Sequence, residues 1–274
     1  MALVMRADVK KTITWKVENK GETVNSQVVS FLDGRVYKAS LEVDKRRFEV
    51  VDAVLSITGK ETHTNKNLDC LKGIEAYIPG KKIIRSKLEG YEKFAIECFL
   101  QCVSALVQAE TYLYVERGYV SKTEYNVYWD MLEKNGCRFY SDSRQYLREG
   151  ALTWMEYVPD RYGADILFER NKEYNVFRIG EIYELYAHLK DTFHEMKMSI
   201  KLDCDLTVKD AVLEVLRAPG AACMTNRENE HKLIGGDFGK ITKREIIEKL
   251  GGSDGCYHLV EMGIELQELI KGLY

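Results

Sequence analysis

Apolar and polar residues alternate along two separate stretches of the chain. Residues 38–54 read KASLEVDKRRFEVVDAV, and residues 197–212 read KMSIKLDCDLTVKDAV. A two-residue period is typical of a half-buried β-strand. Each stretch is interrupted by an aspartate, Asp44 or Asp203, and each ends in Asp-Ala-Val. The pattern therefore predicts two strand–turn–strand units with the same layout.

Shorter matches follow the two stretches in the same order. They pair Thr64-Asn65-Lys66 with Thr225-Asn226-Arg227, Gly80-Lys81 with Gly239-Lys240, and Lys87-Leu88-Glu89-Gly90 with Lys249-Leu250-Gly251-Gly252. An ordered series at a nearly constant offset is hard to obtain by chance, so we predict an internal duplication. Each copy is expected to close with a long helix, Phe94 to Glu116 in the first and Cys256 to Lys271 in the second. Leu259, Met262 and Leu266 form an apolar stripe on the second of these helices.

These patterns predict an α+β protein made of two diverged copies of one unit, in which an antiparallel sheet is followed by helices. Further strands are expected at 12–18 and 24–32 in the first copy, and at 174–178 and 182–189 in the second. Residues 1–120 are predicted to form a first, degenerate repeat, and residues 166–274 a second repeat. Residues 121–165, a tyrosine-rich helical stretch followed by a polar segment, are predicted to connect them.

Composition narrows the functional classes. The net charge is −3 with both signs interspersed, so nothing favours nucleic acid or an anionic membrane as a partner. Residues 1–11 lack the apolar core of a signal peptide, and the most apolar stretch, 94–107, is too short and too polar to span a bilayer. Seven cysteines are an odd number, which argues against a complete disulfide framework. We expect a cytoplasmic protein with reduced thiols.

The strongest local signal is GGSDGCYHLVE at residues 251–261. Glycines before a helix let the backbone turn sharply. A cysteine at a helix start, here Cys256, meets unpaired N–H groups and the positive end of the helix dipole, which favour the thiolate. His258 approaches Cys256 only if the cysteine precedes the first regular turn. Cys256 and His258 are therefore the predicted catalytic residues.

Three further residues are candidate metal ligands together with Cys256 and His258. Cys223 lies in a loop after the second strand, His231 ends the next short element, and His194 opens the strand at 193–202. Cysteine and histidine suit a borderline-soft metal, so zinc, iron or an iron–sulfur cluster is the expected cofactor. The other cysteines are expected to be packing residues.

The second copy resembles an uncharacterised bacterial family of unknown function whose members close with GGxxGCTHLxEL. The residues that carry the likeness are His194-Glu195-Met196, Val208-Lys209-Asp210, Cys223 and 251–262. The same segment is similar to the U-type iron–sulfur scaffold proteins, through the strand at 195–202, Asp210-Ala211, Cys223 and Cys256. This likeness implies a U-type scaffold-like fold with Cys223 and Cys256 as ligands. In the first copy Thr62, Ala95 and Glu97 stand at the matching positions, which implies that this copy lacks the site.

Three hypotheses stay open at this level. The protein is a bacterial metal-binding or iron–sulfur-scaffold-like protein, with its site in the second repeat. Alternatively, it is an enzyme that acts on a small molecule, with Cys256 and His258 in a cleft between the repeats. In the third hypothesis it binds a protein partner, and its cysteines are structural only. Substrate and oligomeric state do not follow from the sequence.

Overall fold

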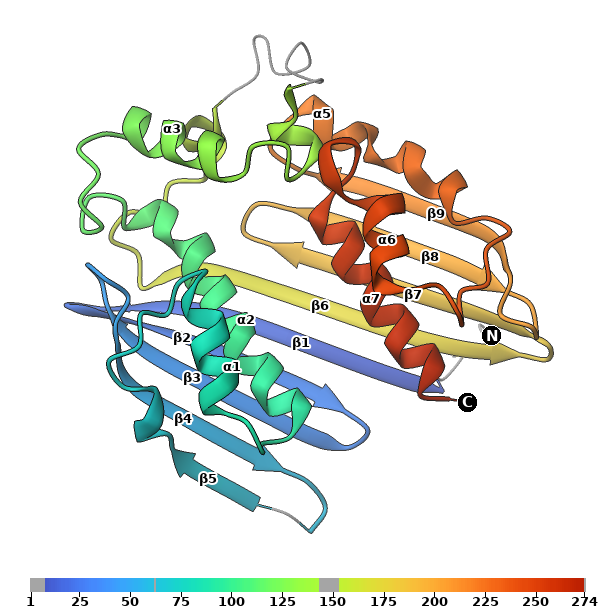
Figure 1. Cartoon of the computed structure of the whole chain (residues 1–274), viewed down its shortest axis with the longest axis horizontal. Coiled ribbons are helices and arrows are strands. Elements are labelled where there is room, and N and C mark those ends of the chain that lie inside the picture. The colour runs from blue at the N-terminus through green and yellow to red at the C-terminus, as the bar shows by residue number, and fades with distance from the viewer. Residues whose placement is uncertain (1–7, 62, 143–152, 274) are drawn as a thin grey trace, which may run out of the picture. The chain divides into compact units, whose positions relative to one another are not determined.

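The computed structural model describes residues 8–61, 63–142 and 153–273 (Figure 1). In these residues the strands are β1 (Val9–Lys20), β2 (Thr23–Leu32), β3 (Arg35–Asp44), β4 (Val50–Thr58), β5 (His63–Asn67), β6 (Ile166–Ile179), β7 (Ile182–Asp191), β8 (Glu195–Leu202) and β9 (Val208–Arg217). The α-helices are α1 (Gly80–Lys87), α2 (Lys93–Ala109), α3 (Lys122–Leu132), α4 (Trp154–Tyr157), α5 (Ala221–Met224), α6 (Lys243–Leu250) and α7 (Tyr257–Lys271). Short 3-10 helices are η1 (Asp69–Leu71), η2 (Glu110–Tyr112), η3 (Arg138–Tyr140), η5 (Thr225–Lys232) and η6 (Gly252–Asp254).

All the described strands belong to one nine-stranded sheet in the order β5-β4-β3-β2-β1-β6-β7-β8-β9. The predicted fold, two diverged copies that each have an antiparallel sheet and helices in a U-type scaffold-like arrangement, is therefore wrong. Strands assigned to separate copies share a single sheet. The alternation of residues specifies which side chains of a strand face the core, but it does not specify which strand lies beside it. The α+β content and most strand positions did follow from the pattern.

The chain forms two compact units, one of which comprises residues 12–125 and 159–171. Here β2, β3, β4 and β5 pair antiparallel in sequence order, and α2 packs on β2 and β3. The predicted turn at Asp44 is confirmed, because its carboxylate accepts hydrogen bonds from the backbone N–H groups of Arg46 and Arg47. Cys98 and Cys102 are buried on α2.

The other unit comprises residues 1–11, 126–158 and 172–274. In it β7, β8 and β9 pair antiparallel, and α7, drawn red in Figure 1, packs against β7, β8 and α6. Leu259, Met262 and Leu266 are fully buried, so the predicted apolar stripe of α7 is confirmed. The turn at Asp203 is also confirmed, since its Oδ1 accepts from the N–H groups of Asp205 and Thr207.

The ends of several elements differ from the prediction. Strand β5 was missed because its sequence, HTNKN, contains no apolar residue. Strand β6 begins at Ile166 rather than at Tyr174, and α2 ends at Ala109 rather than near Glu116.

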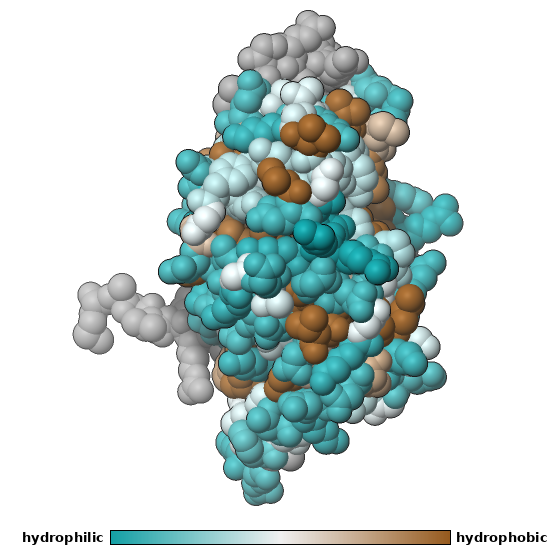
Figure 2. Space-filling view, turned by 90° about the vertical axis from the view of Figure 1, so that its left-hand side faces the viewer, coloured by the Kyte–Doolittle hydropathy of each residue, from teal (hydrophilic) through white to brown (hydrophobic). Residues whose placement is uncertain are grey.

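Hydrophobic side chains are scattered on the face of the molecule drawn in Figure 2. Figure 2 shows a face on which hydrophilic side chains predominate and hydrophobic ones stand in small groups. Scattered apolar residues of this kind are normal on a protein surface. Among the described residues, no helix is both long enough and apolar enough to cross a membrane.

Candidate functional site

The tight turn between β7 and β8 carries two of the candidate side chains. Asp191 ends β7, and His194 directly precedes β8. The Asp191 Oδ1 accepts hydrogen bonds from the backbone N–H groups of Phe193 (2.7 Å) and His194 (2.6 Å). It also lies 3.3 Å from the His194 Nδ1. Aspartate favours turns because its carboxylate bonds to the backbone two residues on, and these donors stabilise its negative charge.

The glycine-rich segment before α7 determines the positions of Cys256 and His258. Gly252 has a φ of +67°, a backbone conformation that favours glycine, and Gly255 passes so close to the Leu250 carbonyl that no side chain fits there. The chain then reaches Cys256, the N-cap residue of α7, in an extended conformation. His258 is the second residue of the helix. Because Cys256 precedes the first regular turn, its Sγ lies 3.7 Å from the His258 Nδ1.

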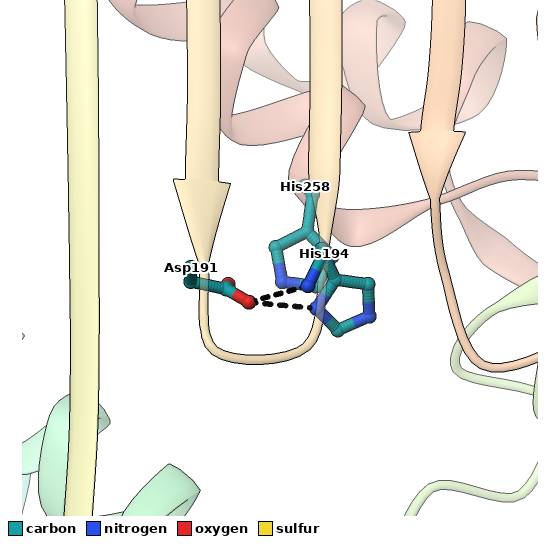
Figure 3. Close-up of side chains that lie close together, drawn as sticks. All are labelled: Asp191, His194 and His258. Carbon is teal, nitrogen blue, oxygen red and sulfur yellow. Dashed lines mark hydrogen bonds and ion pairs between the residues drawn. The ribbon is translucent and has the colours of Figure 1, made fainter. Parts of the chain in front are cut away.

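The hairpin and the helix start converge on one point. The ligand atoms of Asp191, His194 and His258 all lie within 4.8 Å of one another, and the two imidazole rings have centroids 4.3 Å apart. Figure 3 shows the Asp191 carboxylate directed at the two rings. Asp191 and His194 are buried, while His258 is half-buried. The group is thus partly shielded from water.

Aromatic side chains pack around the hairpin. The Trp154 ring lies edge-on to Phe193, with centroids 4.7 Å apart, and is stacked near His194 at 6.5 Å. Phe193 is fully buried. An apolar surround lowers the local dielectric constant and strengthens interactions between a cation and its ligands.

The donor set of this group fits a divalent metal. Two imidazoles and one carboxylate are ligands of zinc and of non-haem iron. Ligands at about 2.0–2.1 Å from a tetrahedral zinc lie about 3.3 Å apart. The separation of Asp191 Oδ1 and His194 Nδ1 is 3.3 Å, which is compatible with this spacing and is also that of a direct contact between the two side chains.

The thiols occupy a neighbouring region of the same unit. Cys256 and Cys223 are both buried, with exposed fractions of 6% and 7%. Burial raises the pKa of the Cys223 thiol, and the nearby thiols of Cys256 and Cys137 raise it further. Neither Cys223 nor Cys256 joins the close group of Asp191, His194 and His258, although every one of these residues is described.

The remaining predicted residues lie elsewhere. His231 is exposed on η5 and is not part of the group. In the other unit Ala95 is buried and Glu97 pairs with Arg85 at 3.2 Å, while Thr62 lies outside the described residues. Asp191 was missed by sequence reasoning. The available signal was its place three residues before His194 and just after the strand predicted at 182–189.

The sequence matches place this site within one known segment. Residues 175–270 match a family of proteins of unknown function (DUF2889). Asp191, His194, Cys223, Cys256 and His258 all lie within the matched segment. The expected likeness to a bacterial family with the GGxxGCTHLxEL ending stays a prediction.

Other comparisons add no functional information. No curated protein matches the chain. One solved structure, a β-barrel-like protein of unknown function (DUF1849) from Brucella abortus, is 8% identical, with 77% of this chain and 92% of that chain covered. Its TM-score is 0.11, so the similarity carries no argument about fold or function.

Proposed function

We propose that the protein binds one divalent transition metal, zinc or iron(II), through Asp191, His194 and His258. The observation that carries this proposal is the convergence of three ligand atoms within 4.8 Å of one another, from a hairpin and a helix start more than sixty residues apart in sequence. A hydrogen-bonded turn alone accounts for the pairing of Asp191 with His194. It does not account for the second imidazole beside them.

Three protein ligands leave at least one coordination position open. Structural zinc sites are usually closed by four protein ligands, whereas catalytic sites keep a position for water or substrate. A metal held here would polarise a bound group or activate a water molecule. The proposal is therefore a metal-dependent enzyme or binding protein that acts on a small molecule.

The test is metal stoichiometry in the full chain, purified without oxygen and then titrated with Zn²⁺ and Fe²⁺. We expect the wild type to bind about one metal ion per chain. The His258→Ala variant should bind the metal much more weakly, because one of the three proposed ligands is missing. His258 is the informative position because it lies on α7 and is not part of the β7–β8 turn. His188→Ala is the matched control, since His188 lies on β7 of the same unit and pairs with Glu195 on the sheet. Absence of stoichiometric metal in the wild type, or equal binding by His258→Ala, would overturn the proposal.

An iron–sulfur scaffold function is not proposed. That interpretation depended on a U-type fold, which the chain does not have, and on Cys223 and Cys256 as joint ligands. The close group contains carboxylate and imidazole donors instead, which suit a single metal ion better than a cluster.

A second candidate is thiol chemistry at Cys256, with His258 as its acid–base partner. It is favoured by the 3.7 Å contact between Sγ and Nδ1, which is a nucleophile–base arrangement. Asp191, His194, Cys256 and His258 belong to one compact unit, so this chemistry is proposed within that unit.

Its test is the rate of Cys256 alkylation by iodoacetamide as a function of pH. We expect an apparent pKa below about 8.5, the value of an ordinary thiol, and a higher one in His258→Ala. A Cys256 that titrates at or above the ordinary value removes the nucleophile. The hypothesis that the cysteines serve packing only would then remain.

A further inference from the structure

The hairpin turn that carries Asp191 and His194 is buried, which is unusual for a tight turn. The exposed fractions of Asp191, Thr192, Phe193 and His194 are 5%, 6%, 0% and 7%. Connecting segments normally run over the surface because their backbone carbonyls need water as a hydrogen-bond partner. A buried turn must obtain these partners from the protein.

Two side chains supply them. The Arg217 guanidinium, at the end of β9, donates from Nη1 to the Thr192 carbonyl at 2.6 Å, and from Nη2 to the carbonyls of Asp191 and, at 3.3 Å, His194. The Tyr157 hydroxyl, at the end of α4, donates to the Phe193 carbonyl at 2.5 Å. The His194 carbonyl also accepts the Asp191 N–H at 2.8 Å. All four carbonyls of the turn therefore have a donor, and the carbonyls of Asp191, Thr192 and Phe193 depend on the two side chains.

A second arginine, Arg138, bonds to the turn before α7 through both its guanidinium and its backbone. Arg138 is 3% exposed. Its backbone N–H donates to the Gly255 carbonyl at 2.8 Å, and its Nη2 donates to the Asp254 carbonyl at 2.6 Å. Its Nη1 donates to the Thr225 hydroxyl at 2.6 Å, which orients the guanidinium. The two carbonyls that Arg138 binds immediately precede Cys256.

We infer that Arg217 and Arg138 are positioning residues, which fix the two turns from which the ligands Asp191, His194 and His258 extend. This inference rests on the proposed metal site. Metal sites require ligand placement to within about 0.5 Å, which a turn with unsatisfied carbonyls cannot provide. Arginine suits the role because its planar fork has five donors in fixed directions, whereas lysine offers one compact charge on a flexible stem.

The experiment compares Arg217→Lys and Arg138→Lys with Arg244→Lys in the full chain, using Co²⁺ as a spectroscopic metal. Arg244 is the matched control because it lies on α6 of the same unit and its side chain is 88% exposed. We expect each test variant to bind Co²⁺ about 10–100-fold more weakly, as is typical for residues that orient metal ligands. The visible absorption of bound Co²⁺ should change as well, since it reports ligand geometry.

A merely structural role gives a different result. It lowers the melting temperature of the variants but leaves the Co²⁺ affinity and spectrum as in the wild type, and that result overturns the inference. If a buried lysine prevents folding, two milder variants replace the first pair. Tyr157→Phe removes the donor to Phe193, and Thr225→Val removes the hydroxyl that holds the Arg138 guanidinium.

A separate measurement distinguishes this inference from the metal proposal. If wild-type protein binds no Co²⁺, the metal proposal fails, and amide hydrogen exchange decides the role of the arginines. Arg217→Lys should then speed exchange at Phe193 and His194 by at least about tenfold relative to Arg244→Lys, because local opening governs exchange. Arg138→Lys should do the same at Cys256, whose N–H is bonded to the Leu250 carbonyl. Unchanged exchange overturns the positioning role without reference to metal.

Discussion

Gly255 gives the sharpest test of how the chain places Cys256. A Cβ atom at this position would lie 2.1 Å from the Leu250 carbonyl oxygen and 2.5 Å from that of Gly251. Real Cβ atoms almost never approach closer than 3.0 Å. Both neighbours are backbone atoms, so no side chain can rotate away to make room. Gly255→Ala must therefore push the backbone apart by almost an ångström.

The cost follows from what that movement breaks. The Leu250 carbonyl accepts the Cys256 N–H at 2.7 Å, and Gly255 itself donates to Gly252 at 3.0 Å. An overpacked site typically costs about 1–3 kcal/mol, and each lost hydrogen bond about 0.5–1.5 kcal/mol. We expect Gly255→Ala to lower the free energy of unfolding by about 2–6 kcal/mol. The Cys256 Sγ and the His258 Nδ1 should also separate.

Urea unfolding followed by circular dichroism measures the first effect, and the alkylation rate of Cys256 in the folded protein measures the second. Gly272→Ala is the control, because Gly272 also adjoins α7 but has a φ of −72° and a nearest Cβ contact of 3.4 Å. It should stay within about 0.5 kcal/mol of the wild type. The reasoning is refuted if Gly255→Ala is equally benign and its Cys256 reacts as in the wild type.

Three further predictions concern other parts of the chain. Burial raises the pKa of Glu110, against the lowering effect of Arg117. The Glu110 carboxyl therefore stays protonated to a higher pH in the folded state than in the unfolded state. The free energy of unfolding of the wild type should fall relative to that of Glu110→Gln as pH rises above 4.5. A difference in urea unfolding that does not depend on pH contradicts this prediction. Exposed Cys70 and Cys204 should react with a disulfide reagent before Cys102, which is fully buried and whose pKa is raised by burial. Mass spectrometry of labelled peptides measures the order, and labelling of Cys102 in the folded protein contradicts the prediction. Thr242→Ala, which removes the capping box with Glu245 at the start of α6, should cost about 1 kcal/mol in thermal or urea unfolding, with Thr242→Ser as the conservative control.

Local chemistry was readable from the sequence where a few adjacent residues determine the structure. The strands flanking Asp44 and Asp203, the stripe of α7 and the approach of Cys256 to His258 all depend on spacing within one segment. Glycines before a helix and a period of two or 3.6 residues are sufficient signals for such features.

The sheet order and the partner of His258 were not readable in this way. Both depend on which distant segments meet, and that choice is made by packing over the whole unit. Asp191 illustrates the limit. Its sequence position predicts a turn residue, and only the fold brings His258 to the same point. His231 was predicted as a metal ligand because it follows Cys223 closely in sequence. In the fold it lies exposed on η5, outside the group of Asp191, His194 and His258.

The proposed ligands and two of the residues that support them come from different parts of the chain. The proposed ligands all lie within residues 175–270, the segment shared with the matched family. Arg138 and Tyr157, which hold the turns that carry those ligands, come from residues outside it. A protein with the same three residues in this segment but a different flanking chain would need its own supports for them. Substitutions in the flanking chain could therefore alter the placement of Asp191, His194 and His258 without changing any of the three residues.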